Sequence, residues 1–281
     1  MRRVLVGTDG SVSAQVAVRW AAEFAAGTGA ELLVANVWLP SFANLSPQIH
    51  DEMRDDASRV LNQEWCPPAR DAGVAFEGVL LEGDPRKALL HAADERDVDL
   101  VVVGAQGHGS HPHALHLGSV AHHVVHHTER PLAAIPASTQ PELPTRILVG
   151  VDGSDGSARA VEWCRDVASA LHAEVLVVHG QAPPAEQVAQ ADGTSWRPGA
   201  LAECARWAEP LSDAGIPTRP LVIEEEPVTA LTETAIHERA ELIVVGTRGR
   251  GGFTGLRLGS TALKVLHYGD RPVVLVPAHH D

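Results

Sequence analysis

The chain of 281 residues is a tandem duplication, and this feature limits its fold more than any other. The stretch VLVGTDGS at residues 4–11 returns 143 residues later as ILVGVDGS at residues 147–154. Further matches follow in the same order along both halves. Solenoid repeats are only ~20–50 residues long, so this period is typical of two duplicated domains. We therefore predict homologous domains at residues 1–138 and 145–281, with a polar, proline-containing linker between them.

Each half alternates short apolar runs with helical stretches. Candidate strands lie near residues 2–7, 31–37, 74–81, 99–104 and 132–136, and again near 146–150, 174–179, 217–223, 241–246 and 273–276. Candidate helices of the first half lie near residues 13–28, 51–72, 85–96 and 118–128. Nearly continuous Val, Leu and Ile runs are typical of strands buried on both faces of a parallel sheet, and such strands need crossover helices. The predicted fold class is α/β, with two homologous doubly wound, five-stranded parallel-sheet domains of the Rossmann-like type.

A glycine-rich pattern follows the fourth predicted strand of the second half. It reads G-x2-G-x9-G-S from Gly246 to Ser260, and it is not a G-x4-G-K-[ST] loop. Glycines let backbone N–H groups approach phosphate oxygens, and Gly259 begins a predicted helix whose first N–H groups attract anions. Arg248 and Arg250 carry guanidinium groups that pair well with phosphate. The pattern therefore indicates a phosphate site, with a flexible strand-to-helix connection as the alternative.

An aspartate ends the first predicted strand of each half, Asp9 in one and Asp152 in the other. Ligands of doubly wound sheets bind beyond the carboxyl ends of the strands, where the strand order reverses. A carboxylate at that edge can accept hydrogen bonds from a ribose or from an adenine amine. The sequence Asp-Gly-Ser also suits the start of a helix, so a turn or capping role is the alternative.

These motifs, in this order of elements, resemble the universal stress protein family and in particular its tandem two-domain members. The resemblance covers essentially the whole chain. It implies an adenine-nucleotide α-hydrolase-like fold and an ATP site, with Mg²⁺, in each half. It also implies that the two halves pack as an intramolecular pseudo-dimer through their final strands, while further association into a homodimer stays open.

The resemblance also implies a set of nucleotide-binding residues. They would follow the first, second and fourth strands, with a backbone contact to adenine from the residue after the second strand, Val37 or its equivalent Gly180. The first-half set is Gly7, Asp9, Val37, Gly104, Gly107, His108, Gly118, Ser119 and Val120. The second-half set is Gly150, Asp152, Gly180, Gly246, Arg248, Gly249, Arg250, Gly251, Gly259, Ser260 and Thr261. No catalytic residue and no metal ligand is expected.

The glycine pattern of the first half departs from that of the second. Ten residues instead of nine separate Gly107 from Gly118. Gln106 and His108 stand where the second half has arginines, so fewer permanent positive charges face a phosphate. We therefore expect the second domain to bind ATP more tightly, by ~1–3 kcal/mol, the range of a charge-assisted hydrogen bond.

Charge and composition exclude several classes of protein. The chain has 22 Lys and Arg against 36 Asp and Glu, a formal net charge of −14. Such an acidic chain lacks the basic surface that nucleic acids and anionic membranes require. No apolar run approaches the ~18 residues of a membrane span, and the first residues lead directly into a predicted strand without a signal peptide. The three cysteines form no C-x-x-C pair, and the expected location is cytoplasmic.

Four histidines follow Gly118 at helical spacing. The pairs His122/His126 and His123/His127 are four residues apart, which can bind zinc or nickel when a third ligand is present. A solvated, partly titrating surface is the alternative and agrees with the expected absence of a metal site. A His-rich metal-binding protein is thus one alternative function.

The expected function is that of an ATP-binding regulatory or stress-response protein with little or slow hydrolysis. It would not be an enzyme. An ATP-using enzyme of a related α/β fold is a further alternative, but it would need paired histidines or an S-G-G-x-D-S loop at the first strand–helix turn. The sequence GTDGS at residues 7–11 has neither.

Overall fold

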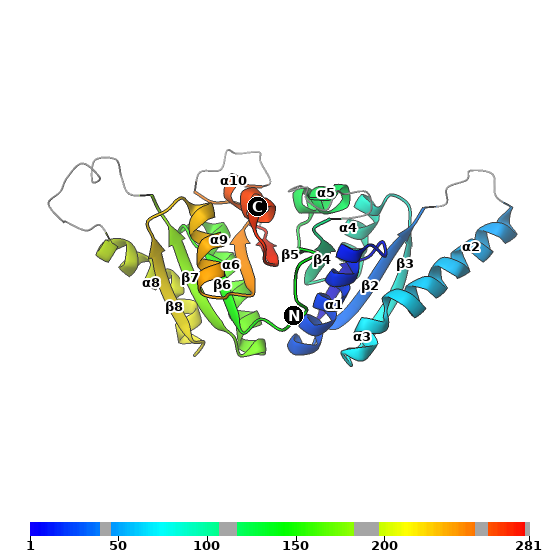
Figure 1. Cartoon of the computed structure of the whole chain (residues 1–281), viewed down its shortest axis with the longest axis horizontal. Coiled ribbons are helices and arrows are strands. Elements are labelled where there is room, and N and C mark those ends of the chain that lie inside the picture. Colours follow the sequence, from blue (N-terminus) through cyan, green and yellow to red (C-terminus); the bar gives the residue numbers. More distant parts are fainter. Residues whose placement is uncertain (40–45, 107–116, 183–196, 251–257, 279–281) are drawn as a thin grey trace. The chain divides into compact units, whose positions relative to one another are not determined.

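The computed structural model describes residues 1–39, 46–106, 117–182, 197–250 and 258–278. The chain divides into two compact units, Met1–Leu143 and Pro144–Asp281 (Figure 1). The boundary lies in the proline-containing stretch that the sequence marks as a linker. The packing of the two halves as a pseudo-dimer stays a prediction.

Unit 1 contains one parallel five-stranded sheet with the strand order β3-β2-β1-β4-β5. Its strands are β1 (Arg3–Gly7), β2 (Glu31–Trp38), β3 (Phe76–Glu82), β4 (Leu100–Gly104) and β5 (Leu132–Ile135). Its helices are α1 (Val12–Thr28), α2 (Pro47–Val60), the π-helical turn η1 (Leu61–Trp65), α3 (Pro67–Asp71), α4 (Pro85–Glu95) and α5 (Ser119–His127). The strand order reverses between β1 and β4.

Unit 2 repeats this arrangement with the order β10-β9-β6-β7-β8, again all parallel. Its strands are β6 (Arg146–Gly150), β7 (Glu174–Gly180), β8 (Thr218–Ile223), β9 (Leu242–Gly246) and β10 (Val273–Val276). Its described helices are α6 (Asp155–Leu171), α8 (Arg197–Asp213), α9 (Pro227–His237) and α10 (Ser260–Tyr268). The predicted fold class is therefore confirmed in both halves.

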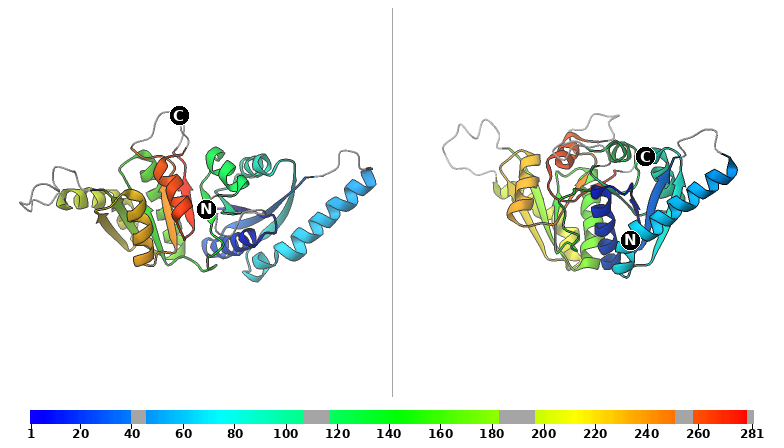
Figure 2. Two further views of the ribbon diagram at one scale, coloured as in Figure 1. Left: turned by 45° about the horizontal axis from the view of Figure 1, so that its top comes forward. Right: turned by 45° about the vertical axis from the view of Figure 1, so that its right-hand side comes forward.

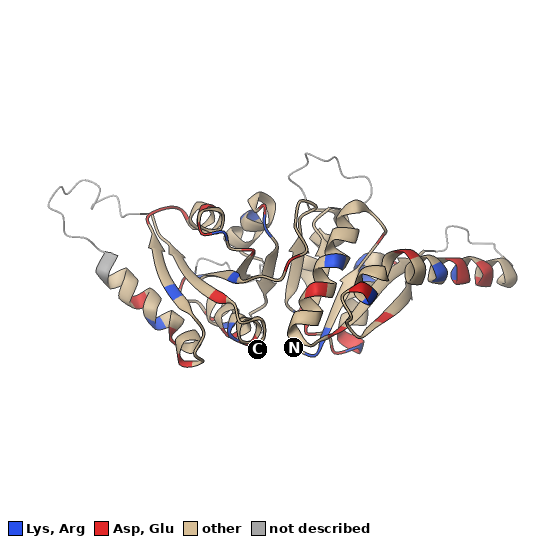
Figure 3. Cartoon of the chain, turned by 60° about the horizontal axis from the view of Figure 1, so that its bottom comes forward, with Lys and Arg blue, Asp and Glu red and all other residues tan. Residues whose placement is uncertain are grey.

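The core of each unit lies between the sheet and two helical layers. The central strands are fully buried, as in Val4–Val6 of β1 and in residues 100–102 of β4, because helices cover both of their faces. In unit 1, α1 contacts the sheet from one side, whereas α4 and α5 contact each other on the other side. Figure 2 shows the same layering in both units. In the ribbon of Figure 3, acidic and basic residues alternate along the outer helices and lie near the strand ends.

The predicted helix at residues 51–72 is wrong in its bounds and in its continuity. The helix begins earlier, at Pro47, because the Ser46 hydroxyl accepts a hydrogen bond from the Ile49 amide and proline suits the first helical position. It then widens into the π-helical turn, and a separate short helix begins at Pro67. A proline lacks the N–H that would continue the α-helical ladder, so the run breaks there.

Candidate functional site

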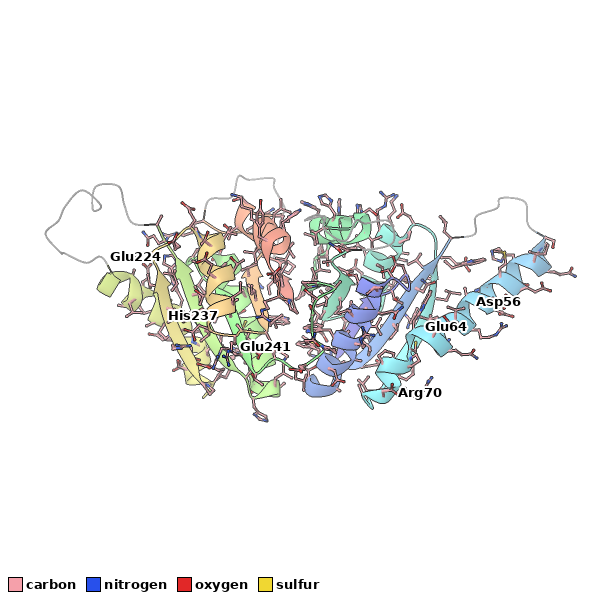
Figure 4. The ribbon with its side chains drawn as sticks, in the orientation of Figure 1. Asp56, Glu64, Arg70, Glu224, His237 and Glu241 are labelled. Carbon is pink, nitrogen blue, oxygen red and sulfur yellow. The ribbon has the colours of Figure 1, made fainter. Side chains whose placement is uncertain are left out.

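Each unit has a cavity at the carboxyl edge of its sheet, where the strand order reverses. The cavity of unit 2 measures about 400 Å³ and that of unit 1 about 220 Å³. In Figure 4, Glu224, which follows β8, marks this edge of unit 2, and Glu241, which precedes β9, marks the opposite edge. This is the place where doubly wound sheets bind ligands.

The Asp-Gly-Ser turn builds one wall of the unit 2 cavity. Asp152 Oδ1 accepts hydrogen bonds from the Ser154 amide at 3.0 Å and from the Ser154 hydroxyl at 2.5 Å. Gly153 has φ 76°, a conformation that favours glycine. Ser154 caps α6 by accepting a hydrogen bond from the Ser157 amide at 3.2 Å. The motif therefore forms the helix start that the sequence left as an alternative.

Unit 1 builds the same turn. Asp9 Oδ1 accepts a hydrogen bond from the Ser11 amide at 2.9 Å, and the Ser11 hydroxyl accepts one from the Ala14 amide at 3.3 Å. Asp9 nevertheless lines its cavity, as Asp152 does in unit 2. A turn role and a ligand-facing position therefore coincide at these two aspartates.

Asp152 has a second partner far away in the sequence. Its Oδ2 accepts a hydrogen bond from the Arg250 amide at 2.8 Å, which ties the glycine-rich segment to the start of α6. Burial raises the pKa of the Asp152 carboxyl, but the hydrogen bonds from Ser154 and from the Arg250 amide outweigh burial and hold the pKa below its usual range. A side chain at Gly249 would collide with this contact, because its Cβ would lie 2.4 Å from Asp152 Oδ2. A larger residue here would displace the Asp152 carboxylate and so disturb its hydrogen bond with the Arg250 amide.

The helix after the glycine-rich segment begins at the cavity. The Gly259 amide donates to the Thr247 carbonyl at 2.7 Å, and in unit 1 the Gly118 amide donates to the Ala105 carbonyl at 2.8 Å. These bonds bring the ends of each segment together. Within the part of the chain that the structure describes, no side chain caps α5 or α10. Their first N–H groups are therefore available to an anion, next to a positive helix end.

The end of the second strand differs from the prediction. Val37 does not follow β2 but lies within it, and Gly180 is the last residue of β7. The β1–β2 register ends at Ala35, whose carbonyl accepts the Thr8 amide at 2.8 Å. Residues two apart in a strand direct their backbone groups to the same side. The N–H and C=O of Val37 therefore point to the β1 side, as those of Ala35 do, but they lie beyond the last β1–β2 pair, Gly7 with Ala35.

Asn36 and His179 hold these strand ends, and sequence reasoning missed both. Asn36 Nδ2 donates to the Thr8 carbonyl at 2.8 Å, and His179 Nδ1 lies 2.8 Å from the Val151 carbonyl. A carbonyl can only accept, so His179 carries its proton on Nδ1. The two polar residues occupy equivalent positions of the repeat, and this equivalence could have pointed to them in the sequence.

The structure brings nearly all predicted site residues to the two cavities. The predicted residues that line the unit 1 cavity are Gly7, Asp9, Val37, Gly104, Gly118, Ser119 and Val120. Those that line the unit 2 cavity are Gly150, Asp152, Gly180, Gly246, Arg248, Gly249, Arg250, Gly259, Ser260 and Thr261. Gly107, His108 and Gly251 lie outside the described residues. The prediction missed an apolar wall in each cavity, formed by Pro85 and Leu89 from α4 and by Pro227 and Leu231 from α9.

The histidines of α5 form two ring pairs. The His123 and His127 rings stack with centroids 4.0 Å apart, and the His122 and His126 centroids are 4.6 Å apart. Burial, followed by neighbouring His122, lowers the pKa of His126. Over the described ranges, no three His, Cys, Asp or Glu side chains are grouped so that they could bind a metal ion.

Two α/β units in tandem, each with a ligand-sized cavity at its switch point, define a duplicated protein of the doubly wound class. A family model described as the universal stress protein family matches residues 1–136 and 144–277. The chain therefore belongs to the universal stress protein family.

Several relatives match over nearly the full length. A universal stress protein of Mycobacterium tuberculosis is 32% identical over 298 residues, covering 97% of this chain and 95% of the relative. One from Mycolicibacterium smegmatis is 28% identical, covering 97% and 96%. The crystal structure of a universal stress protein from Archaeoglobus fulgidus has a TM-score of 0.76 and 24% identity, covering 98% of both chains. A universal stress protein crystallised in complex with cAMP matches 48% of this chain and 96% of its own, with 30% identity and a TM-score of 0.40.

One structural property bears on membranes. Among the described helices, none combines the length and the apolar character that crossing a membrane requires.

Proposed function

We propose that this protein is a regulatory protein that binds ATP at the carboxyl edge of its sheets, most tightly in unit 2. The observation that carries the proposal is the start of α10. Its uncapped N–H groups face a cavity of about 400 Å³ that Arg248 and Arg250 also line. A helix N-terminus and guanidinium groups together favour a phosphate chain.

The opposite part of the cavity suits a nucleoside. Apolar contacts come from Pro227, Leu231 and Val245, and Gly180 offers backbone groups at the end of β7. An adenine ring needs an apolar slot and a backbone donor and acceptor along its edge. The cavity thus combines an apolar end with an anion-binding end, which matches the two ends of ATP.

Mg²⁺ would arrive with the triphosphate. Magnesium is usually bound by one or two carboxylates together with substrate phosphates. Among the described residues that line the cavity, Asp152 is the acidic one, and both of its oxygens already accept hydrogen bonds. The phosphate oxygens would therefore supply most of the metal's ligands.

ATP serves in this proposal as a regulatory ligand and not as a substrate that turns over rapidly. A general base works best with a pKa near the working pH. The hydrogen bonds to Asp152 hold its pKa below the usual range instead, which makes it a weak base. Bound nucleotide would then change the conformation of the glycine-rich segment and thereby the binding of a partner. Because ATP would be hydrolysed slowly, this conformation would last longer than in a fast ATPase.

The test is a calorimetric titration of ATP into the purified full chain. Saturable binding is expected, and it should be lost in a double variant, Val120→Trp with Thr261→Trp, which places an indole in each cavity. Chromatography of the nucleotide after incubation should recover it largely as ATP. Absence of binding at millimolar ATP, or binding that the double variant keeps, would refute the proposal. Rapid release of ADP or of another product would instead favour an enzyme.

A further inference from the structure

The two cavities differ in a way that points to two different ligands. We infer that unit 2 takes the nucleoside triphosphate, whereas unit 1 takes an adenine nucleoside that carries at most one phosphate. The inference rests on the proposed function, because it assigns ligands to the same two sites. Three differences between the cavities carry it, and each concerns residues at equivalent positions of the repeat.

The first difference is the size of the cavity, together with the residue at the end of the second strand. Unit 1 has Val37 where unit 2 has Gly180, and the unit 1 cavity is the smaller one, about 220 Å³ against about 400 Å³. A Cβ at Gly180 would lie 2.6 Å from Ala230 Cβ and 2.8 Å from Pro227 Cα, so α9 packs closely there and glycine is required. In unit 2 this side-chain position is therefore filled by α9, whereas in unit 1 the Val37 side chain itself lines the smaller cavity.

The second difference is the chemistry at the phosphate end. Gln106 lines the unit 1 cavity where Arg248 lines that of unit 2. In the first turn of the following helix, Val120 of α5 corresponds to Thr261 of α10, and both line their cavities. Unit 2 thus offers a guanidinium and a hydroxyl where unit 1 offers an amide and an isopropyl group. Both changes favour phosphate oxygens in unit 2 and disfavour them in unit 1.

The third difference is the charge balance. Of the side chains described around the unit 1 cavity, the one charged at neutral pH is that of Asp9. In unit 2 the carboxylate of Asp152 is accompanied by Arg248 and Arg250. A carboxylate without a nearby guanidinium repels a triphosphate, which carries several negative charges, but it can still accept a hydrogen bond from a ribose hydroxyl. Among its described residues, the unit 1 cavity therefore keeps a carboxylate that can accept from a ribose and has no guanidinium group to neutralise a triphosphate.

Single blocking variants of the full chain separate the two sites. Thr261→Trp leaves the unit 1 cavity open, and Val120→Trp leaves the unit 2 cavity open. Adenosine, AMP and ATP are titrated into each variant by calorimetry at pH 8, where histidines with an ordinary pKa near 6.5 are neutral. With unit 2 open, ATP should bind about tenfold to a hundredfold more tightly than adenosine, the effect of one charge-assisted hydrogen bond. With unit 1 open, adenosine or AMP should bind at least as tightly as ATP.

Reciprocal exchanges provide the matched control. Each exchange introduces the residue that the other half already has at the equivalent position, so both variants should fold. Arg248→Gln, added to Val120→Trp, should remove about tenfold or more of the preference for ATP in unit 2. Gln106→Arg, added to Thr261→Trp, should raise the affinity of unit 1 for ATP and leave that for adenosine nearly unchanged.

Two outcomes would count against the inference, and they are distinguishable. Equal ratios of ATP to adenosine affinity in the two cavities would overturn the assignment of different ligands while leaving the proposed function intact. Failure of every adenine ligand to bind either cavity would overturn the proposed function, and this inference with it.

Discussion

The hydrogen bonds of Asp152 allow a quantitative prediction for unit 2. Asp152→Ala removes an acceptor from the Ser154 amide, the Ser154 hydroxyl and the Arg250 amide, which lie 3.0, 2.5 and 2.8 Å from the carboxylate oxygens. Hydrogen bonds to charged groups contribute ~1.5–3 kcal/mol each when they are buried. The side chain is only partly buried, so water replaces much of the loss, and we expect a net destabilisation of about 2 kcal/mol.

The measurement is thermal unfolding of the full chain by calorimetry. For a domain of this size, about 2 kcal/mol corresponds to a fall in Tm of roughly 5–10 °C for the transition of unit 2. Asp152→Asn keeps one acceptor oxygen and should fall between the wild type and the alanine variant. Hydrogen exchange supplies a local readout, because the Arg250 amide should lose its protection in the alanine variant.

The pH dependence of the same interaction has a definite sign. The folded-state pKa of Asp152 lies below its unfolded value, so the unfolded state binds more protons as the pH falls. The stabilisation is therefore complete above about pH 4, the unfolded pKa, and is lost at lower pH. The difference in Tm between wild type and Asp152→Ala should shrink in acid. An alanine variant with unchanged Tm and an equally protected Arg250 amide would refute the reasoning.

Two further predictions concern charges away from the cavities. The pKa of His126 is lowered mainly by burial, so the unfolded state binds the proton more tightly, and His126 should destabilise unit 1 as the pH falls below about 6.5. The variant His126→Gln should therefore lose less Tm than the wild type between pH 7.5 and 5.5. An equal loss of Tm in both proteins would contradict this. Arg219 of β8 pairs with Glu238 after α9, and the equivalent positions of unit 1 hold the exchanged pair Glu77 and Arg96. In urea unfolding, Arg219→Glu should lower the free energy of unfolding by about 0.5–1 kcal/mol, and adding Glu238→Arg should restore most of that loss. If the double variant instead shows the sum of the two single losses, the two side chains are not coupled.

The strands could be predicted from the sequence because burial on both faces leaves a strong pattern. β4 and β9, for instance, are runs of Leu, Ile and Val that end in glycine, and both were predicted to within one residue. The helical region after β2 was harder. No residue of α2 is buried and most of its residues are polar, so few apolar side chains mark it as a packed helix, and its bounds depend on the cap at Ser46 and the break at Pro67.

The site was predictable in its position and in most of its residues, but not in its internal contacts. Strand ends of a parallel sheet meet at one edge whatever the details, so the motifs near Asp152 and Gly246 had to converge. The bond from the Arg250 amide to Asp152 joins residues 98 positions apart, and no local pattern reveals it. The same holds for the close approach of α9 to Gly180, which leaves no room for a side chain there.

Comparison of the two cavities separates residues that build the scaffold from residues that face the ligand. The turn aspartate, the capping serine and the amide that closes the glycine-rich segment occur in both halves with nearly the same geometry. The differences at Val37, Gln106 and Val120, compared with their equivalents in unit 2, lie on the walls of the cavity. These three side chains leave the turn and the helix start intact but change the volume and charge of the space between them. If the inference above holds, equivalent folds present one site for a nucleoside triphosphate and another for a ligand of lower charge.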